Sequence, residues 1–355
     1  SYQSEAILIS SAFTVFLPAC WAALFAFNAI SFASSSRTCV NAILASSETR
    51  KAPPFLRSFS IAANGRVVLF DDITNTNGES LINVLVPKGI KELVFQYLEM
   101  ISQKQIDEIR HHLDAAENPL FIWDGDTDGL CSFLLLRRHA GKGNYIIARD
   151  GPDVTLDLLK QVNEISPDKI FILDKPLVSQ EFIDGANVPI IWLDHHMPVE
   201  RKGVRYYNPR IENVKHEQCT TYWAYEVVKK DIWIAMMGIV ADWRTDHIAE
   251  FAKKYPGLIK HKVKIAPDVL YNTELGRLIR YTAFMLKGKM KDVRKNVDMM
   301  ISMTSPYELL NEESGKAKKL MVYAKKLDKV YDGLLKKALE NKADDKFFLF
   351  LYPNG

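Results

Sequence analysis

Cysteine is scarce in this sequence, and its distribution excludes one class of small metal-binding fold. The 355 residues include only four cysteines, which lie far apart and form no CxxC pair: Cys20, Cys39, Cys131 and Cys219. A zinc ribbon is therefore excluded, and a disulfide scaffold is not expected in a chain of this length. This scarcity favours a reduced, intracellular protein, and we expect a cytoplasmic location.

The sequence also lacks a large excess of either charge. Its formal net charge is +3, which is too small to make the whole molecule a polycation. Hydrophobic residues make up 48% and charged residues 25% of the chain. These values are typical of a globular protein and exclude wholesale disorder or a collagen-like chain. The length leaves room for two or three domains of roughly 100–200 residues each.

Charge is almost absent from residues 1–66, which carry only seven charged side chains. Within them, Ala6–Ser34 has no charged residue and is long enough to cross a bilayer as a helix. Basic residues follow from Arg37 onward, so the positive-inside rule would leave the rest of the chain in the cytoplasm. This segment is either a membrane anchor or an extension outside the functional fold.

Short apolar runs alternate with helical patterns further along the chain. The patterns predict strands over 119–124, 144–148, 168–174 and 188–194, and helices over 129–140, 155–165 and 180–184. Continuous apolar strands that alternate with helices indicate an α/β fold, in which helices cover both faces of a parallel sheet. Ligands of such sheets bind beyond the carboxyl ends of the strands.

Three of the predicted strands end in aspartate, at Asp124, Asp174 and Asp194. A single aspartate at a strand end is usually a helix cap or a turn residue. Three at one sheet edge, with two histidines after the third, would raise one another's pKa values unless cations neutralised them. Mixed carboxylate and imidazole groups suit a divalent metal such as Mn2+, with Mg2+ or Zn2+ as alternatives.

Four motifs in order carry a family resemblance: WDGDTDG at 123–129, Asp174 in FILDKP, LDHH at 193–196 and GIVADW at 238–243. Together they resemble the motifs of the DHH phosphoesterase superfamily, and the D-x-D-x-D-G form is most similar to its RecJ-like nuclease branch. The resemblance covers roughly residues 119–246, about a third of the chain. It implies a two-metal phosphodiesterase with an attached substrate-binding domain.

The resemblance also implies roles for individual residues. It assigns the binding of two Mn2+ ions, with Mg2+ as the alternative, to one set of ligands: Asp124, Asp126, Asp128, Asp174, His195 and Asp242. Asp174 would bridge the two ions. His196 would contact the scissile phosphate or protonate the leaving oxygen, and Asp194 would orient its neighbours.

One ligand of some superfamily members is replaced in this chain. Those members have a histidine four residues before the first motif aspartate, where this sequence has Leu120. Asp128 is either a substitute for that ligand or a turn residue before Gly129.

The sign of the charge changes after the motif region. Residues 119–246 contain fifteen Lys and Arg against nineteen Asp and Glu, whereas residues 247–295 contain twelve basic and four acidic residues. An acidic metal centre followed by a basic module fits a phosphate-backbone substrate, while lysines on a solvated helix surface are the plain alternative. The expected substrate contacts are Lys287, Lys289, Arg294 and Thr220. For Thr220 the alternative is a helix N-cap.

These patterns divide the chain into six segments. They are the low-charge segment 1–66, a lead-in with a helix at 67–118, a DHH catalytic domain at 119–246, a basic helical region at 247–311, a connecting helix at 312–343 and residues 344–355. The last segment resembles the first strand of the DHHA1 domain that follows in the family. The chain has no GGGH-like stretch, so we expect a truncated domain or a surface supplied by a protein partner or a second copy.

The expected function is hydrolysis of phosphodiester bonds in single-stranded DNA or RNA by a RecJ-like exonuclease. A phosphodiesterase of short oligonucleotides, cyclic dinucleotides or nucleotide phosphates is the alternative within the same class. A catalytically silent RecJ-like scaffold in a replication or repair assembly is the alternative from another class.

Overall fold

The structure is a computed structural model that describes residues 59–62, 66–69, 103–149, 151, 153–212, 214 and 216–340. The chain divides into two units, Ser1–Gln103 and Lys104–Gly355. In the first unit, β1 (Phe59–Ala62) and β2 (Arg66–Leu69) pair in antiparallel fashion. The predicted membrane segment at Ala6–Ser34 and the predicted domain start at 344–355 lie outside the described residues.

In the part of the chain that the structure describes, no helix combines the length and the apolar character that crossing a bilayer requires.

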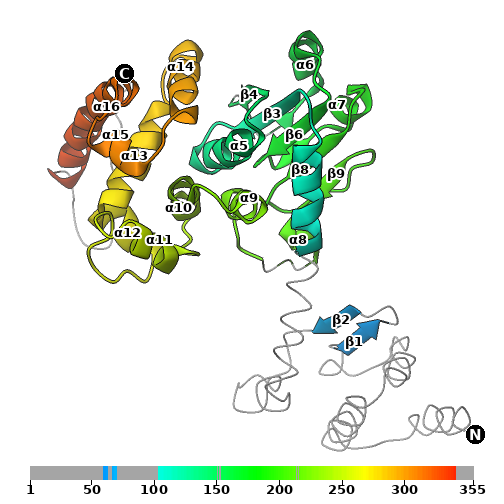
Figure 1. The fold of residues 1–355 in the computed structure, drawn as a ribbon, viewed down its shortest axis with the longest axis horizontal. Helices are drawn as coiled ribbons and strands as arrows, with labels where there is room; N and C mark the ends of the chain where they lie inside the picture. The colour runs from blue at the N-terminus through cyan, green and yellow to red at the C-terminus, as the bar shows by residue number, and fades with distance from the viewer. Residues whose placement is uncertain are drawn as a thin grey trace, which may run out of the picture. The chain divides into compact units, whose positions relative to one another are not determined.

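The second unit is built on a five-stranded sheet, drawn in green and cyan in Figure 1. Its strand order is β4–β3–β6–β8–β9, and all neighbouring strands are parallel. The strands are β3 (Pro119–Asp124), β4 (Asn144–Ala148), β6 (Lys169–Leu173), β8 (Ile190–Leu193) and β9 (Arg205–Tyr207). The α/β class and the four predicted strands are thereby confirmed, and β9 is an additional, short edge strand.

Alternate residues of each strand face opposite layers, because successive side chains of a strand point to opposite sides of the sheet. In β3, Phe121 and Trp123 pack in one hydrophobic cluster, whereas Leu120 and Ile122 pack in the other. The first cluster is covered by α5 (Thr127–Ala140), α9 (Thr220–Val228) and α10 (Ile232–Ala241). The second is covered by α6 (Leu159–Ile165) and α7 (Gln180–Gly185).

Short elements complete the sheet layer. Two-residue strands, β5 (Asp153–Val154) and β7 (Leu177–Val178), pair in parallel beside the main sheet. The turn η3 (Leu156–Leu158) leads into α6, and α8 (Pro209–Glu212) follows β9.

The turn from β3 into α5 brings the first motif onto the edge of the sheet. Asp126 is the N-cap of α5, and its Oδ1 accepts a hydrogen bond from the Gly129 backbone N–H at 2.9 Å. A Cβ on Gly129 would lie 2.3 Å from the Asp124 carbonyl oxygen, so this close approach requires glycine. At the other end, Gly141 adopts the left-handed conformation and ends the helix.

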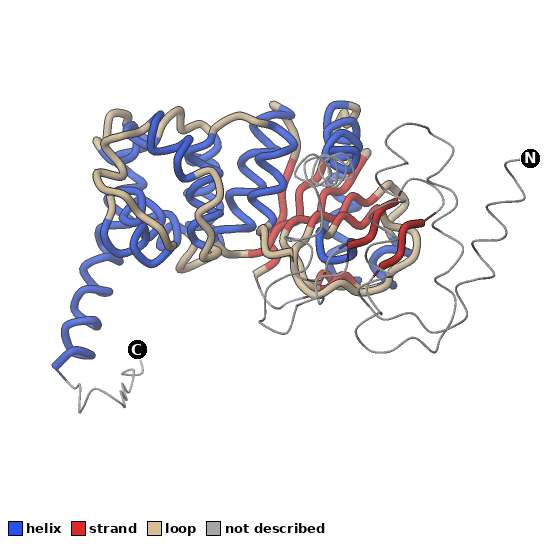
Figure 2. Tube along the Cα trace, turned by 90° about the horizontal axis from the view of Figure 1, so that it is seen from below, coloured by secondary structure: helices blue, strands red, loops and turns tan. Residues whose placement is uncertain are grey.

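The remaining helices form the other half of this unit, as Figure 2 shows from a second direction. They are α11 (Ile248–Lys254), α12 (Ala266–Asn272), α13 (Glu274–Met285), α14 (Met290–Ile301), α15 (Pro306–Leu310) and α16 (Gly315–Glu340). One buried cluster runs from β3 to α16 and joins the two halves. Arg138 of α5 reinforces the junction by donating hydrogen bonds to the carbonyl oxygens of Ile301 and Met303.

Candidate metal centre

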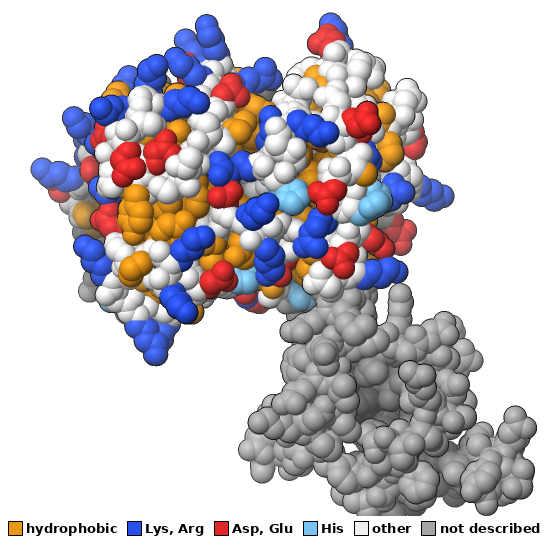
Figure 3. Space-filling view, in the orientation of Figure 1, with side chains coloured by type: hydrophobic (Ala, Val, Ile, Leu, Met, Phe, Trp, Pro, Cys, Tyr) orange, Lys and Arg blue, Asp and Glu red, His pale blue; other side chains and the backbone are white. Residues whose placement is uncertain are grey.

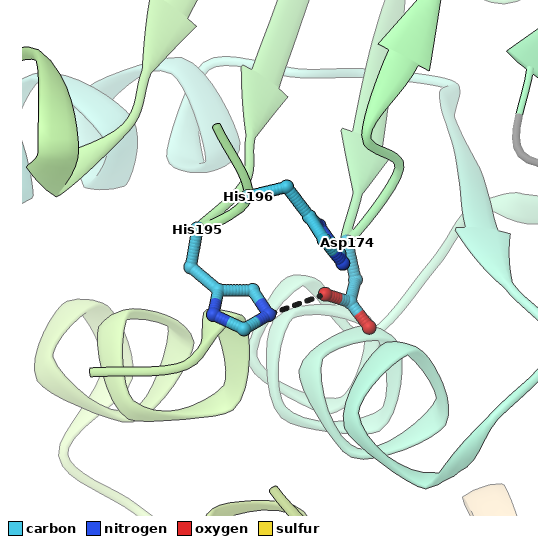
Figure 4. A group of neighbouring side chains, drawn as sticks. All are labelled: Asp174, His195 and His196. Carbon is cyan, nitrogen blue, oxygen red and sulfur yellow. Dashed lines mark ion pairs between the residues drawn. The ribbon is translucent and has the colours of Figure 1, made fainter. Parts of the chain in front are cut away.

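The carboxyl ends of three neighbouring strands gather the motif side chains. Asp124 is the last residue of β3, Asp174 directly follows β6, and His195 and His196 follow β8 by two and three residues. Because the three strands are parallel neighbours, their carboxyl ends lie at one edge of the sheet. Figure 4 shows the His195 ring directed at the Asp174 carboxylate, with His196 alongside.

Asp174 sits at the middle of this group in a costly conformation. Its backbone φ is +60°, a region that residues other than glycine seldom adopt, and its side chain is buried. Oδ1 accepts a hydrogen bond from the Thr220 hydroxyl at 3.0 Å and lies 3.4 Å from His195 Nε2. Burial, together with the neighbouring carboxylates, raises the pKa of Asp174 well above its usual value. Such strain and such a shift are typical of a functional carboxylate.

His195 also lies near carboxylates from two helices. Its Nδ1 is 3.8 Å from Asp242 Oδ2 at the end of α10, and its Nε2 is 3.9 Å from Asp128 Oδ2 in α5. Burial, followed by the charges of nearby carboxylates, raises the pKa of Asp242 to about 7. Burial and neighbouring carboxylates raise the pKa of Asp126 to about 6. In the absence of a cation, the ionised forms of Asp126 and Asp242 are therefore disfavoured.

This donor set fits a divalent cation. Asp174, His195 and His196 offer ligand atoms that lie within 4.8 Å of one another, and so do Asp128, Cys219 and Asp242. A bound cation would neutralise the carboxylates whose pKa values are raised, which removes the cost of ionising them together. Carboxylate oxygens with one or two imidazoles suit Mn2+ or Mg2+ better than a soft metal.

His196 differs from His195 in its pKa, because the buried carboxylate of Asp194 forms a hydrogen bond with its ring. Its Nδ1 lies 2.7 Å from Asp194 Oδ1, while 41% of its side chain is exposed. This hydrogen bond raises the pKa of His196, whereas burial lowers the pKa of His195. Asp194 is fixed in turn, since its Oδ2 accepts hydrogen bonds from the Tyr206 hydroxyl and the Asn208 side-chain amide, each at 3.1 Å. The pair therefore presents an oriented, protonatable imidazole at the site.

Asp128 has a structural task at this edge. Its two carboxylate oxygens accept hydrogen bonds from the backbone N–H groups of Thr220 and Thr221, at 3.0 and 2.8 Å. These donors form the first turn of α9, whose N-cap residue is Cys219. Asp128 therefore ties α9 to α5, and its role as a metal ligand stays a prediction.

The predicted substrate contacts fall into two groups. Thr220 is buried, is the first residue of α9 instead of its N-cap, and contacts Asp174. Lys287, Lys289 and Arg294 are exposed, at or near the start of α14. The loop between the two lysines is held against the sheet by Arg149, which donates a hydrogen bond to the Gly288 carbonyl at 2.9 Å.

Some residues at this edge were not anticipated from the sequence. Lys175 directly follows Asp174 and is fully buried, with its Nζ 2.7 Å from Asp124 Oδ1. Asn208 and Arg210 come from the loop and helix after β9; the Arg210 Nε is buried without a hydrogen-bond partner among the described residues. The sequence signals these residues only weakly, through the position of Lys175 next to a motif residue and through the NPR triplet at 208–210.

Comparison with known proteins supports the resemblance. Residues 120–252 match the model of the DHH family, N-terminal domain. No curated protein matches the chain. Among solved structures, it is similar to exonuclease RecJ bound to manganese, with 14% identity, a TM-score of 0.47 and coverage of 66% of this chain and 69% of that chain.

Two further solved structures are similar. RecJ in complex with Mn2+ from Thermus thermophilus shares 15% identity at a TM-score of 0.48, with coverage of 69% of this chain and 40% of that chain. The DHH domain of a member of the S1P family of ribosomal proteins shares 14% identity at a TM-score of 0.46, with coverage of 70% and 64%. The chain thus spans less than two thirds of these last two proteins.

The family-model match contains all four motifs. It confirms the DHH resemblance over residues 120–252, and the side-chain groups that could hold a metal ion lie within the same stretch.

Proposed function

We propose that this protein is a divalent-metal-dependent hydrolase that cleaves phosphodiester bonds of single-stranded nucleic acid, in the manner of a RecJ-like exonuclease. The observation that carries the proposal is the convergence of Asp174, His195 and Asp242 beside the exposed His196. A divalent ion bound there would supply Lewis acidity toward a phosphate and an activated water.

The chain's own residues supply the remaining chemistry. His196 is exposed to substrate and carries a proton to higher pH than an ordinary histidine, because Asp194 raises its pKa. It is therefore suited to donate that proton from Nε2 to the leaving oxygen, while Asp194 holds Nδ1. Thr220 keeps the Asp174 carboxylate in place through its hydroxyl.

A phosphate backbone explains the basic surface beside the site. Figure 3 shows Lys and Arg side chains spread over the helical half of the unit. Arg149 packs over Gly125 of the first motif, where a Cβ would meet its side chain at 2.8 Å, and also binds Gly288 in the loop that carries Lys287 and Lys289. This chain of contacts brings two exposed lysines next to the motif loop. A strand longer than a dinucleotide would reach both.

The proposal is tested by hydrolysis of end-labelled single-stranded RNA and DNA, alongside a dinucleotide, with Mn2+ and with chelator. Each substrate is given to the intact chain and to Asp174→Asn, because asparagine tolerates the positive φ at this position. We expect Mn2+-dependent shortening of the long strands by the intact chain and its loss in the variant. A matched control, Asp184→Asn on the surface helix α7, should retain activity.

Other outcomes separate the alternatives. Cleavage confined to the dinucleotide would assign the protein to enzymes of short oligonucleotides or cyclic dinucleotides. Measurable Mn2+ binding without turnover of any substrate would contradict the proposal and favour a silent scaffold.

A further inference from the structure

Lys175 places an ammonium group inside the candidate metal centre. Its side chain has no solvent exposure. The ammonium donates three hydrogen bonds: to Asp124 Oδ1 at 2.7 Å, to the Ala148 carbonyl at 3.1 Å and to the Gly151 carbonyl at 2.7 Å. A lysine ammonium has three donors, so all of them are used. The group is therefore fixed at the carboxyl ends of β3 and β4.

The position of this ammonium matters because Asp124 is the first aspartate of the motif. A buried ammonium without a carboxylate partner would be very costly, so the ion pair holds both groups together. A divalent ion at Asp124 Oδ1 would lie beside the ammonium and would be repelled by it. Asp124 is thus already neutralised before any metal binds.

Among the described residues, neither group of side chains that could hold a metal ion includes Asp124. Leu120 is fully buried in the cluster on the α6–α7 face and offers no ligand atom. Asp128 accepts one hydrogen bond at each oxygen from the first turn of α9, and its ligand atoms group with those of Cys219 and Asp242. In contrast, His195 Nε2 lies 3.4 Å from Asp174 Oδ1, and Asp174 forms no ion pair with a lysine or arginine of the described residues.

We propose that the ammonium of Lys175 takes the place of one of two metal ions, so that the centre holds a single divalent ion. That ion binds among Asp126, Asp174 and the Nε2 of His195, and Lys175 keeps Asp124 neutral beside it. The inference rests on the metal dependence in the proposed function but not on any substrate. It makes Lys175 a residue that sets the number of ions in the centre.

The number of bound Mn2+ ions tests this inference directly. Equilibrium dialysis of the intact chain against Mn2+, with metal analysis of the protein compartment, should give one ion per chain. The electron paramagnetic resonance spectrum of that sample should be that of an isolated Mn2+. Two ions per chain with a spin-coupled spectrum would overturn the inference, and so would no bound ion.

Two variants sharpen the test. The double substitution Asp124→Asn with Lys175→Met removes both charges together and so leaves no unpaired buried ion. It should still bind one Mn2+ ion. Its Kd for Mn2+ should be no more than about tenfold higher than that of the intact chain, because loss of an outer-shell partner weakens metal binding by about this factor. Asp126→Asn, which removes a ligand, should lose the ion. If the double variant bound no Mn2+ while folded by circular dichroism, Asp124 would be a ligand and the inference would fail.

These measurements also separate the inference from the proposed function. One bound Mn2+ in a chain that cleaves no nucleic acid would uphold the role of Lys175 and contradict the proposed function. Two bound ions in a chain that cleaves nucleic acid would contradict the role of Lys175 and uphold the proposed function. If the double variant did not fold, the ion count and spectrum of the intact chain would still decide.

Discussion

Asp174 shows how a single residue can be kept in place at a cost to stability. Its backbone is left-handed, its side chain is buried, and its pKa is raised well above the usual value. The Thr220 hydroxyl and the His195 ring lie against its carboxylate. A carboxylate in these conditions destabilises the protein when no cation is bound, so its cost is expected to show in the free energy of unfolding.

The raised pKa of Asp174 predicts how the stability of the metal-free protein changes with pH. A carboxyl group with a higher pKa in the folded state binds its proton more tightly there, so folding stability is lost as the pH rises above the unfolded value of 3.8. We expect Asp174→Asn to be more stable than the intact chain in chelator, with a difference that grows as the pH rises above the usual carboxyl pKa. Thermal melts should show a gain of a few degrees, since ~1 kcal/mol shifts Tm by about 2–4 °C in a domain of 150–250 residues.

Saturating Mn2+ supplies the control for this prediction. An ion at 100 times its Kd stabilises the folded state by about 2.7 kcal/mol, and the variant should not gain this. The order of the two Tm values should therefore reverse when chelator is replaced by Mn2+. An equal Tm for both proteins in chelator at all pH values would show that Asp174 is not strained by its charge.

Among single residues, the sequence predicts the positions of the aspartates at the strand ends. It does not predict that Lys175 beside them is buried. Asp124, Asp174 and Asp194 follow apolar runs, so their positions come from a local pattern. Lys175 is buried because its ammonium meets Asp124, Ala148 and Gly151, which lie 51, 27 and 24 residues away in the chain. Hydropathy places a lysine on the surface, and only the folded sheet shows why this one is inside.

The elements were predicted where their apolar pattern is long enough to be read. The strands over 119–124 and 144–148 have the predicted bounds. Two elements differ for local reasons. β9 has only three residues and owes its hydrogen bonds to β8, so no periodicity marks it. The helix α5 begins at Thr127, two residues before the predicted start, because Asp126 caps it.

The connection between α5 and α9 gives a prediction at the scale of the element. Asp128→Ala would leave the buried N–H groups of Thr220 and Thr221 without their acceptor. A buried donor left unpaired costs about 1–3 kcal/mol, so we expect the loss of two acceptors to lower the free energy of unfolding by ~2 kcal/mol, partly offset by removal of a charge beside Asp174 and Asp242. Urea denaturation of the metal-free protein measures this loss without any contribution from a bound ion.

Asp128→Asn is the matched control for that variant. Asparagine keeps one acceptor oxygen for the first turn of α9, so it should recover part of the loss. If both variants kept the stability of the intact chain, then α9 would not depend on Asp128, and the case for this residue as a metal ligand would become stronger.

At the scale of the whole unit, the distribution of charge links the two halves. Residues 119–246 are acidic and residues 247–295 are basic, while one hydrophobic core runs through both. Arg138 and Arg149 cross the junction through hydrogen bonds to backbone carbonyls. This junction fixes the basic helices relative to the acidic edge of the sheet, so a phosphate backbone could contact both at once.

That arrangement predicts how salt affects binding of a long strand. Replacing Lys287, Lys289 and Arg294 together with alanine removes three exposed charges from α14 and the loop before it. For single strands, log K falls with log salt concentration with a slope of about −0.7 per phosphate contacted. We expect the triple variant to bind a labelled single strand more weakly and to lose up to about two units of this slope. Fluorescence anisotropy in Mn2+ over a series of salt concentrations measures both quantities.

The same titrations with a dinucleotide and with a distant lysine variant show whether the effect belongs to this surface. A dinucleotide carries too few phosphates to contact all three basic side chains, so its affinity should change less than that of a long strand. Lys160→Ala is the charge control, because Lys160 is exposed on α6, on the opposite face of the sheet. An equal loss of slope in Lys160→Ala and in the triple variant would mean that long strands are attracted by net charge alone. A loss confined to the triple variant would place the path of the strand along α14 and its preceding loop.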